Sequence, residues 1–511
     1  MLTRKYNRSA LYTTAFVTGA CVMVIEITAS RVMAPFFGTS LYVWTNVIGI
    51  VMAALALGYW LGGKLSERLG HGRALFAIIL LAGIFSAAIP FALAPFSRAA
   101  AKTLLAAGSD GSAIIIVVSF FVLIALFALP ILLLGLVSPY IIRLLTLEDR
   151  AVGEVAGRLF AVSTAGSIFG TFVPVLVLVP LIGSKKTILA AAGALIFLGV
   201  IGISVSWRKT KAALIAAGII LAVMITPATL RWRDGLIAEK ESAYEYVSVQ
   251  DEKNYGRTMR FNEGLGIQSA VFADGSRTGF YWDYLPAILS SAGEREGKKK
   301  VLLIGLAGGS IARGIAAGWG DGAEITGVEI NPDVISLGRK YFDLDGVRNL
   351  TIVNEDGRTF LARSNDKYDL IIVDAFTNQL YIPPHLSTVE FFKLCRERLA
   401  AGGMMSLNAV FYSEKAELYK RLTATLKAVF PAVEYYRNTG SYNYLVAAGE
   451  ENFDWEYGVR AAPESIKDLA EEIQKGIAEF PDSGGRLLTD DDSPIEILTD
   501  AQVFDVLLRR G

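Results

Sequence analysis

Charged residues, cysteine and histidine are scarce in this sequence of 511 residues. Asp, Glu, Lys and Arg make up only 19% of it, and 49 basic residues balance 49 acidic ones, so no positive excess predicts a nucleic-acid partner. The two cysteines, Cys21 and Cys395, lie far apart and give neither a disulfide framework nor a metal-binding spacing. With only His71 and His385, the sequence excludes histidine-rich metal sites and most histidine-based catalysis, and we predict no metal centre.

Apolar residues are abundant instead. They make up 53% of the chain, and the mean hydropathy of +0.44 is too high for a wholly soluble protein. Most of them lie within residues 1–230, in runs that can each cross a bilayer as a helix of about twenty residues. The runs are Leu11–Met33, Val43–Gly63, Ala74–Phe96, Ala113–Leu145, Leu159–Ile182, Thr187–Trp207 and Ala212–Thr229.

We therefore predict a polytopic α-helical membrane domain over residues 1–230, with seven or eight helices, in the inner or plasma membrane. Basic residues in the short connections favour a cytosolic N-terminus. Seven crossings would then place the carboxyl-terminal half outside, whereas we expect it in the cytosol. The run Ala113–Leu145, with Pro130 and Pro139, is predicted to be a hidden pair of helices or a broken helix; the alternative is an external N-terminus.

Two ionisable residues, Glu26 and Arg31, lie within the first apolar run. A charge at membrane depth is costly unless it is paired. The two residues indicate either a polar site between helices or groups that neutralise each other or reach the interface, and the sequence leaves both open.

The remainder of the chain is predicted to be an α/β unit. Residues 231–295 contain short β-rich segments separated by turns, which predicts a small antiparallel β-hairpin platform. In residues 296–511 apolar strands alternate with helical segments, which predicts a Rossmann-like domain that binds ligands at the carboxyl ends of its strands. Its predicted strands include Val301–Ile304, Glu324–Glu329, Leu350–Asn354 and Leu370–Asp374.

The segment Val301–Gly314, VLLIGLAGGSIARG, runs from a strand through a glycine-rich turn towards a helix. Such a turn brings backbone N–H groups close to a ligand. About twenty residues later Glu329 ends the next strand and is predicted to accept the ribose hydroxyls, and Asp356 follows a third strand, where it can accept from an adenine amino group. The predicted binding glycines are Gly305, Gly308, Gly309 and Gly357.

These segments, in this order, resemble the spermidine synthase family of aminopropyltransferases. The resemblance covers about Glu239–Val446 and rests on ESAYEYVSVQD, GFYWDYL, IGLAGGS, VEIN, NEDGRTFL and YDLIIVDAF. It implies a β-hairpin platform followed by a class I methyltransferase-like Rossmann domain. It also implies decarboxylated S-adenosylmethionine as the substrate, with no required cofactor. An amine attacks the carbon next to the sulfonium, which yields a longer polyamine and methylthioadenosine.

The resemblance assigns Asp374 as the acid at the reacting centre and Tyr281 as a residue beside the substrates. The sequence also departs from the family pattern. Gly308 stands where the family has an aspartate for the aminopropyl ammonium, and Thr377 stands where it has one for the acceptor amine. In the same pattern Glu245 replaces a glutamine, and a histidine is replaced by Trp282.

Other residues could compensate for the two missing carboxylates. Glu245, Asp283 and the acidic run Asp490–Asp492 could supply negative charge, although a solvated surface is an equal interpretation. Trp282, Tyr281 and Tyr381 could line an amine pocket through cation–π contacts, with simple packing as the alternative. His385, in the expected gate loop Tyr381–Ser387, is interpreted as a turn residue rather than a base.

The sequence predicts a membrane-anchored, aminopropyltransferase-like enzyme whose partners are a nucleoside sulfonium, a polyamine and the lipid bilayer, and it leaves a homodimer open. An alternative is that S-adenosylmethionine itself is cleaved by a lyase or cyclase, or donates a methyl group. A third hypothesis is a membrane sensor or transporter with a nucleoside- or polyamine-binding domain. Asp374 favours an enzyme, because a sensor needs no acid at a reacting centre.

Overall fold

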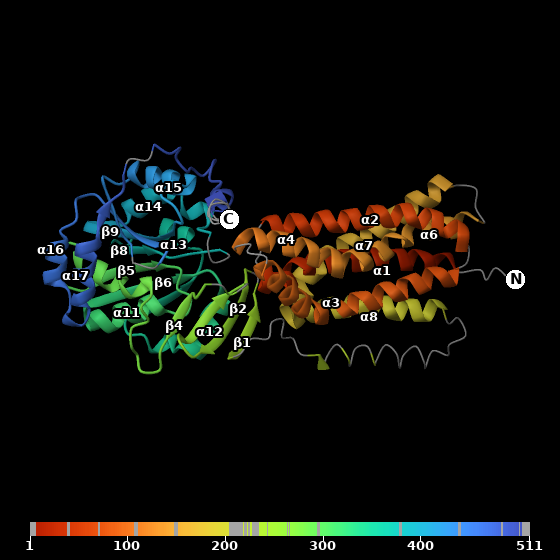
Figure 1. Cartoon of the computed structure of the whole chain (residues 1–511), viewed down its shortest axis with the longest axis horizontal. Coiled ribbons are helices and arrows are strands. Elements are labelled where there is room, and N and C mark those ends of the chain that lie inside the picture. The colour runs from red at the N-terminus through yellow and green to blue at the C-terminus, as the bar shows by residue number, and fades with distance from the viewer. Residues whose placement is uncertain are drawn as a thin grey trace. The chain divides into compact units, whose positions relative to one another are not determined.

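The computed structural model of the chain contains two compact units, Met1–Arg233 and Asp234–Gly511 (Figure 1). It describes residues 7–37, 41–69, 72–106, 111–147, 152–203, 218, 222, 225–226, 235–242, 244–262, 264, 266–293, 297–377, 381–437, 441–481, 484–499 and 501–502.

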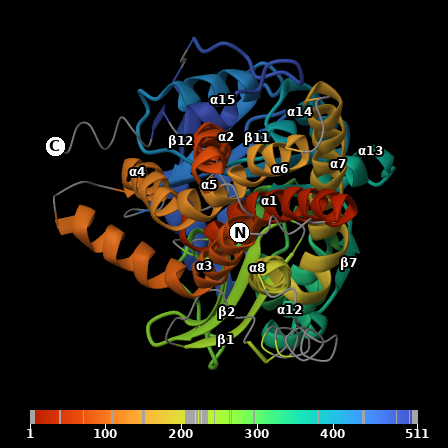
Figure 2. The ribbon, with the colours of Figure 1, turned by 90° about the vertical axis from the view of Figure 1, so that its right-hand side faces the viewer.

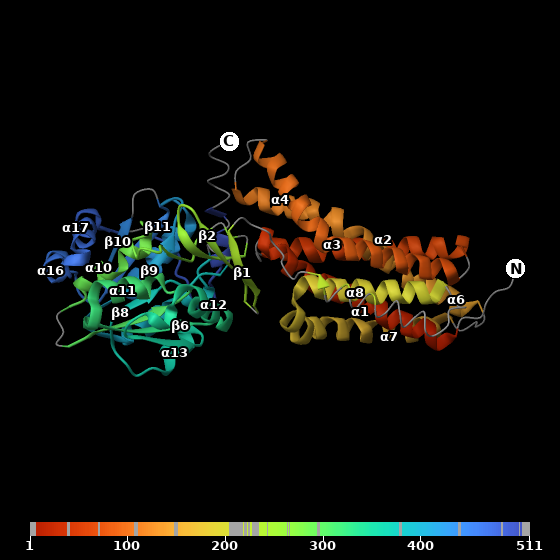
Figure 3. The ribbon, with the colours of Figure 1, turned by 90° about the horizontal axis from the view of Figure 1, so that it is seen from below.

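The first unit is a bundle of long helices that lie side by side (Figures 1 and 3). Its α-helices are α1 (Arg8–Phe37), α2 (Leu41–Leu69), α3 (Gly72–Ala106), α4 (Gly111–Leu123), α5 (Leu129–Gly135), α6 (Val137–Thr146), α7 (Val152–Val173) and α8 (Val179–Ile203). Figure 2, which looks along the bundle, shows α1 near its axis with the other helices around it.

Two short π-helices, η1 (Ile124–Ala128) and η2 (Pro174–Leu178), interrupt the bundle helices. Each ends two residues before a proline, Pro130 or Pro180. Proline lacks an N–H and its ring clashes with the carbonyl group four residues earlier, and a wider π turn accommodates both defects. The predicted broken helix in Ala113–Leu145 is therefore confirmed, and no hidden pair is found among its described residues.

Glycines allow the bundle helices to approach one another closely. On α7, a Cβ atom at Gly166 would lie 2.1 Å from the carbonyl oxygen of Phe16, and one at Gly170 would lie 2.2 Å from that of Ala20. On α2, a Cβ atom at Gly58 would lie 2.5 Å from the carbonyl oxygen of Leu132 in α5. These are the small-residue contacts by which apolar helices associate without help from water.

Apolar side chains cover much of the outside of the bundle as well as its interior. Leu181 is 75% exposed, Leu176 is 69% exposed and Phe121 is 60% exposed. Five described segments are long and apolar enough to cross a membrane, and the fifth, Val152–Ile203, has a kink at Gly183. The predicted run Ala212–Thr229 lies almost wholly outside the described residues, so the number of seven or eight helices stays a prediction.

The second unit begins with a four-stranded antiparallel sheet in the order β1-β2-β3-β4. Its strands are β1 (Leu236–Glu241), β2 (Tyr246–Glu252), β3 (Gly256–Phe261) and β4 (Ser269–Val271). One face of this sheet buries Val247, Val249 and Met259 against Val334 and Phe342 of helix α12 (Pro332–Phe342). That packing sets the segment before β2, which carries Glu245, against the start of α12.

The larger sheet has eight strands in the order β12-β10-β11-β9-β8-β5-β6-β7. Strands β7, β6, β5, β8 and β9 are parallel, and β11 is antiparallel to β9, which is the topology of class I methyltransferases. The strands are β5 (Lys299–Ile304), β6 (Ala323–Glu329), β7 (Leu350–Asn354), β8 (Tyr368–Val373), β9 (Leu399–Val410), β10 (Ala432–Arg437), β11 (Asn443–Gly449) and β12 (Ala478–Glu479). The predicted Rossmann-like fold is therefore confirmed.

Helices cover both faces of this sheet, because its central strands are apolar on both sides. Even-numbered residues of β5, such as Leu302 and Ile304, pack into one buried cluster, and odd-numbered ones, such as Val301 and Leu303, into another. The covering helices are α10 (Leu285–Ile288), α11 (Ser310–Trp319), α12, α13 (Gly357–Arg363), α14 (Val389–Glu397), α15 (Glu417–Lys427), α16 (Trp455–Ala461) and α17 (Lys467–Gly476). The polar ends of the strands are left at one edge.

Close contact between α1 and α7 gives a stability prediction. Gly170→Ala puts a methyl group against the Ala20 carbonyl oxygen, and we expect it to destabilise the bundle by about 1–3 kcal/mol. Gly157→Ala on the same helix meets no atom within 4 Å, and we expect it to stabilise α7 by up to about 1 kcal/mol. Thermal unfolding of the purified full-length variants in detergent checks both; equal midpoints would contradict the packing.

Candidate functional site

The glycine turn after β5 passes directly over the residue that follows β8. A Cβ atom at Gly305 would lie 2.3 Å from the carbonyl oxygen of Asp374, and Gly305 has φ 95°, so a side chain is excluded there for two reasons. The Asp374 N–H donates to the carbonyl of Ile304, at 2.9 Å. The predicted glycine turn and the predicted catalytic acid therefore lie side by side.

Glu329, at the end of β6, is buried, with 7% of its surface exposed. Its Oε2 accepts from the N–H groups of Leu306 and Ala307, at 3.2 and 3.0 Å, and its Oε1 accepts from the Asn331 N–H at 3.0 Å. Burial raises the pKa of Glu329, while these backbone donors oppose the rise. The carboxylate is thus held at the glycine turn, where we predict that the ribose binds.

Glu245 lies beside Glu329, although it comes from the smaller sheet. Its Oε1 accepts from the Asn331 side-chain amide at 2.8 Å, and the same amide donates to the Ser242 hydroxyl at 2.8 Å. Burial is the main cause that raises the pKa of Glu245 to about 7; the Asn331 bond lowers it, and the charge of Glu329 raises it further. Asn331 therefore joins two carboxyl groups on the predicted nucleoside side.

Asp356 begins helix α13, where its Oδ1 accepts from the N–H and hydroxyl of Thr359, at 2.9 and 3.0 Å. Its Oδ2 lies 3.0 Å from Nε2 of His385, in the predicted gate loop. Partial burial opposes its charge, but the bonds from Thr359 and His385 lower the pKa of Asp356. The next residue, Gly357, has no room for a side chain, because a Cβ atom there would lie 2.3 Å from the side chain of Ile304.

Asp374 is the centre of a hydrogen-bonded group that joins the ends of strands β8, β9 and β11 to the short 3-10 helix Tyr281–Asp283. The Tyr281 hydroxyl lies 3.0 and 2.9 Å from its two carboxylate oxygens, and the Asn408 amide donates to Oδ1 at 2.8 Å. Asn408 in turn accepts from the Asn443 amide at 2.9 Å. Burial raises the pKa of Asp374 to about 7, and the bonds from Asn408 and Tyr281 limit the rise.

Gly308, which replaces a carboxylate of the family pattern, is packed against β4. Its N–H donates to the Ser269 hydroxyl at 2.8 Å, and a Cβ atom would lie 2.9 Å from Cβ of Ser269 and 3.2 Å from the ring of Phe342. The fold therefore leaves little room for a side chain at this position. Gly309, with φ 85°, caps the start of α11.

Thr377 and Tyr381 pair as the two ends of a short loop. The Thr377 N–H donates to the Tyr381 carbonyl at 2.8 Å, and the Tyr381 N–H donates back at 3.1 Å. Thr377 is exposed and Tyr381 is half-buried. The two residues thus form an isolated antiparallel bridge shortly after Asp374, and their contact with substrate stays a prediction.

Two residues beside Tyr281 have local structural partners. Asp283 accepts from the Gly279 N–H at 2.7 Å and from the Thr278 hydroxyl at 3.2 Å, which closes the turn before it. The Trp282 ring is 2% exposed, and its N–H donates to Thr278 at 2.7 Å. Trp282 therefore packs in the core and Asp283 closes its own turn, and their contact with substrate stays a prediction.

The acidic run Asp490–Asp492 also has structural partners. Both oxygens of Asp490 accept from Arg358, at 2.7 and 2.6 Å, and Asp492 pairs with Arg421 at 3.0 Å. These ion pairs fix the carboxyl-terminal segment on α13 and α15. These two acids therefore pair with arginines, and the compensation by this run stays a prediction.

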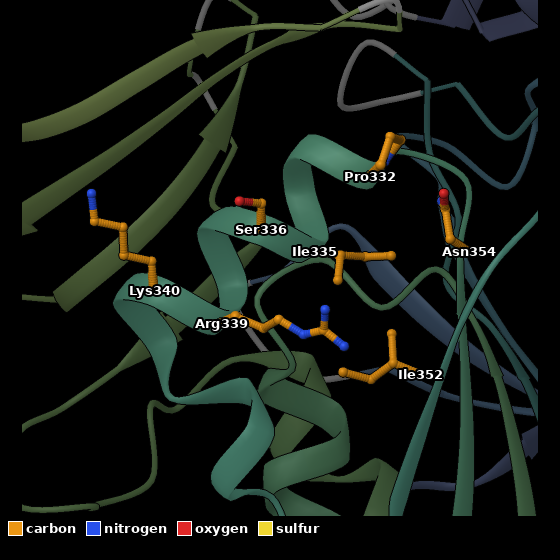
Figure 4. Close-up of a pocket in the computed structure, with 7 residues that line it drawn as sticks. All are labelled: Pro332, Ile335, Ser336, Arg339, Lys340, Ile352 and Asn354. Atoms are coloured by element: carbon orange, nitrogen blue, oxygen red, sulfur yellow. The ribbon is translucent and has the colours of Figure 1, made fainter.

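A cavity of about 500 Å³ lies between α12 and the edge strand β7. Figure 4 shows the Arg339 side chain reaching towards Ile352, while Lys340 points away. At its rim the Asn354 amide donates to the carbonyl oxygens of Glu329 and Ile330, at 2.8 and 3.0 Å. The cavity borders the turn that carries Glu329, but Glu329, Asp356 and Asp374 do not line it, so it is not the candidate centre.

Asn408 and Asn443 are site residues that were not predicted from the sequence. Asn408 is buried in β9 one position beyond Leu407, which pairs with Val373 at the end of β8. The available signal was a polar residue near the carboxyl end of β9, the strand that lies beside β8. Parallel strands end at one edge of a sheet, so such a residue is expected near Asp374, which follows β8. Asn443 gave no such signal, since β11 runs in the opposite direction and begins there.

The raised pKa of Glu245 predicts a pH-dependent stability. From its usual 4.5 to about 7 the folded protein holds a proton that the unfolded chain has lost, so stability falls as pH rises through this window. Glu245→Gln keeps the Asn331 bond and removes the ionisation, so we expect its unfolding midpoint to exceed that of the wild type by more at pH 8 than at pH 5. The control is Glu464→Gln, with a 93% exposed side chain; a constant difference would refute the assignment.

Comparison with known proteins gives a family. The crystal structure of a probable spermidine synthase from Corynebacterium glutamicum aligns with 51% of this chain and 97% of its own, at 19% identity and a TM-score of 0.39. Residues 287–442 match the family model described as spermine/spermidine synthase domain. A probable polyamine aminopropyl transferase of Bifidobacterium longum is 29% identical over 57% of this chain and 69% of its own length. Polyamine aminopropyltransferase 2 of Streptomyces coelicolor is 24% identical over 82% of this chain and 77% of its own. The predicted resemblance to the spermidine synthase family is therefore confirmed, and residues 287–442 carry its domain.

Proposed function

We propose that the carboxyl-terminal unit transfers an aminopropyl group from decarboxylated S-adenosylmethionine to an amine. The observation that carries this proposal is the placement of Asp374 beside the glycine turn, held by Tyr281 and Asn408. Relatives described as polyamine aminopropyl transferases support the reaction class. No cofactor takes part in the proposed reaction.

In the proposed reaction the lone pair of the amine nitrogen attacks the methylene carbon next to the sulfonium. The carbon–sulfur bond breaks, and its electron pair neutralises the sulfur, which leaves as methylthioadenosine. The attacking nitrogen gives up a proton to Asp374. Because the sulfonium is already a good leaving group, the protein has only to align the two reactants and accept this proton.

Asp374 suits this role because its pKa of about 7 lies near the pH at which a general base works best. Tyr281 and Asn408 are neutral donors, so they orient the carboxylate without the lasting ion pair that an arginine or lysine would form. A carboxylate oriented in this way retains its attraction for the ammonium form of the incoming amine.

The nucleoside is proposed to bind on the other side of the glycine turn. Glu329 would accept the ribose hydroxyls, and Asp356 would accept from the adenine amino group. Glu245 would add a second carboxyl near the ribose through Asn331, which already joins it to Glu329. In this arrangement Asp356 would bind both His385 and the adenine. His385 contacts only the Oδ2 atom of that carboxylate.

A second candidate function rests on Gly308. Its packing against Ser269 and Phe342 leaves the aminopropyl side of the turn without the family carboxylate. S-Adenosylmethionine carries a carboxylate of its own, which such an acid would repel. Cleavage of S-adenosylmethionine itself, as a lyase, a cyclase or a methyl donor, is therefore the alternative reaction.

The helical unit is proposed to insert in a membrane and to keep the enzyme there. Five apolar segments of sufficient length and an outer surface rich in exposed apolar side chains support this location. We expect the catalytic unit in the cytosol, where its nucleoside substrate is made.

Product analysis tests the proposed reaction. Purified full-length protein with decarboxylated S-adenosylmethionine and putrescine or spermidine should yield methylthioadenosine and an amine that is heavier by one aminopropyl group. Asp374→Asn should lower turnover by about 10²–10⁴-fold, because it removes the base, while nucleoside binding survives. Methylthioadenosine formed from S-adenosylmethionine alone, without any added amine, would overturn the transferase in favour of the second candidate.

The pH profile tests the role of Asp374 and its partners. We expect turnover to rise as pH increases through about 7, because the base must lose its proton. Tyr281→Phe removes a hydrogen bond that favours the carboxylate, so the rise should move to higher pH. The control is Tyr284→Phe, whose hydroxyl contacts Glu472 instead and which should leave the profile in place. An unshifted profile in Tyr281→Phe would remove Tyr281 from this role.

A further inference from the structure

Glu26 lies on a buried stripe of α1. Residues spaced three and four apart along a helix share one face, and this stripe faces the interior of the bundle. Every other member of the stripe is uncharged. Its exposed fractions are 3% at Leu11, 0% at Ala15, 4% at Thr18, 8% at Val22, 6% at Glu26, 0% at Ala29 and 0% at Met33.

The other buried polar side chains of α1 have partners within the helix. The hydroxyl groups of Thr14 and Thr18 donate to backbone carbonyls one turn earlier, at 2.8 and 2.9 Å, and Ser30 donates to Ile27 at 3.1 Å. A carboxylate cannot do this, because it only accepts. Oε2 of Glu26 is buried and has no hydrogen-bond partner among the residues that the structure describes.

The helix register places Glu26 at the level of η2. Phe16 meets Gly166 and Ala20 meets Gly170, so α1 and α7 run parallel with matched four-residue steps. Six residues beyond Ala20, Glu26 lies at the level of residue 176, within η2. A π-helix departs from the regular hydrogen-bond ladder, and such turns recur at functional sites in helices. The same level of the bundle thus combines a buried acid with irregular backbone.

Among the charged residues of α7 and α8, two lysines of α8 lie nearest this level. The thiol of Cys21 contacts the Ala191 carbonyl at 3.6 Å. Because α8 runs antiparallel to α1, Lys185 and Lys186 lie closest to the level of Glu26 along the bundle axis. The ammonium group of Lys185 lies 5.1 Å from the ring centroid of Phe91 on α3. On α7 the charged residues Glu154 and Arg158 pair with each other near its start, far from η2.

A buried carboxyl with an unpartnered oxygen is costly in an apolar bundle, and a cation or a proton removes that cost. An ammonium group offers several N–H donors to a carboxylate and to backbone carbonyls of an irregular turn. We propose that Glu26 anchors a binding site for the ammonium group of a small amine inside the helical unit. The choice of an amine rests on the proposed function of the carboxyl-terminal unit, which would use such a compound as its acceptor.

Labelling with dicyclohexylcarbodiimide tests the site in the full-length protein. This apolar reagent adds to a protonated buried carboxyl: the carboxyl oxygen bonds to the central carbon, its proton moves to one nitrogen, and acyl migration yields a stable N-acylurea. Mass spectrometry should find the adduct on Glu26 in the wild type and none there in Glu26→Gln. Putrescine or spermidine should slow labelling by a factor of 1 + [L]/Kd, about tenfold at ten times Kd.

Matched controls separate this site from the catalytic one. A neutral diol of the same length as putrescine, and sodium chloride at equal ionic strength, should not protect Glu26. In Asp374→Asn, protection of Glu26 by amines should persist although turnover is lost, so the two proposals can fail independently. Labelling of Glu26 that amines do not slow, or no adduct on Glu26 in the wild type, would overturn the proposed site.

Discussion

The approach of Gly305 to the backbone of Asp374 is the contact on which the catalytic unit depends. Strands β5 and β8 are neighbours in the sheet, so the turns that follow them must pass each other within one residue. Any side chain at Gly305 would separate them and move Asp374 away from the turn that holds Glu329. The proposed nucleoside side and the proposed reacting side of the site are therefore joined through a single residue without a side chain.

Four acids of the candidate site are held by different hydrogen-bond partners, and these partners influence the pKa of each acid. Backbone donors hold Glu329, a helix start and a histidine hold Asp356, an asparagine holds Glu245, and a tyrosine and an asparagine hold Asp374. Only Asp356 has a lowered pKa among them. Burial raises the pKa of Asp374 and of Glu245 to about 7, so these two carboxyl groups can take up a proton near neutral pH, which suits acid–base chemistry more than fixed ion pairing.

In the helical unit, too, residues without a side chain allow close packing. Glycines on α2 and α7 bring helices close enough for backbone contacts, and prolines introduce π turns where the helices must continue. Against this tightly packed background one buried acid on α1 is conspicuous, because its Oε2 is buried without a hydrogen bond from the described residues and so carries a desolvation cost.

The sequence by itself determined the boundary between apolar and α/β regions, the parallel strands β5 to β8, and the glycine turn with Glu329, Asp356 and Asp374. These features have local causes: long apolar runs, alternating elements and glycine spacing. The partners Asn408, Asn443 and His385, and the structural roles of Asp283, Trp282, Asp490 and Asp492, were decided only by the tertiary structure. Whether a carboxylate faces a substrate or an arginine depends on which distant segment packs against it. Asp490, for example, pairs with Arg358 of α13, which lies 132 residues earlier in the chain. Spacing along the chain carries no record of such contacts.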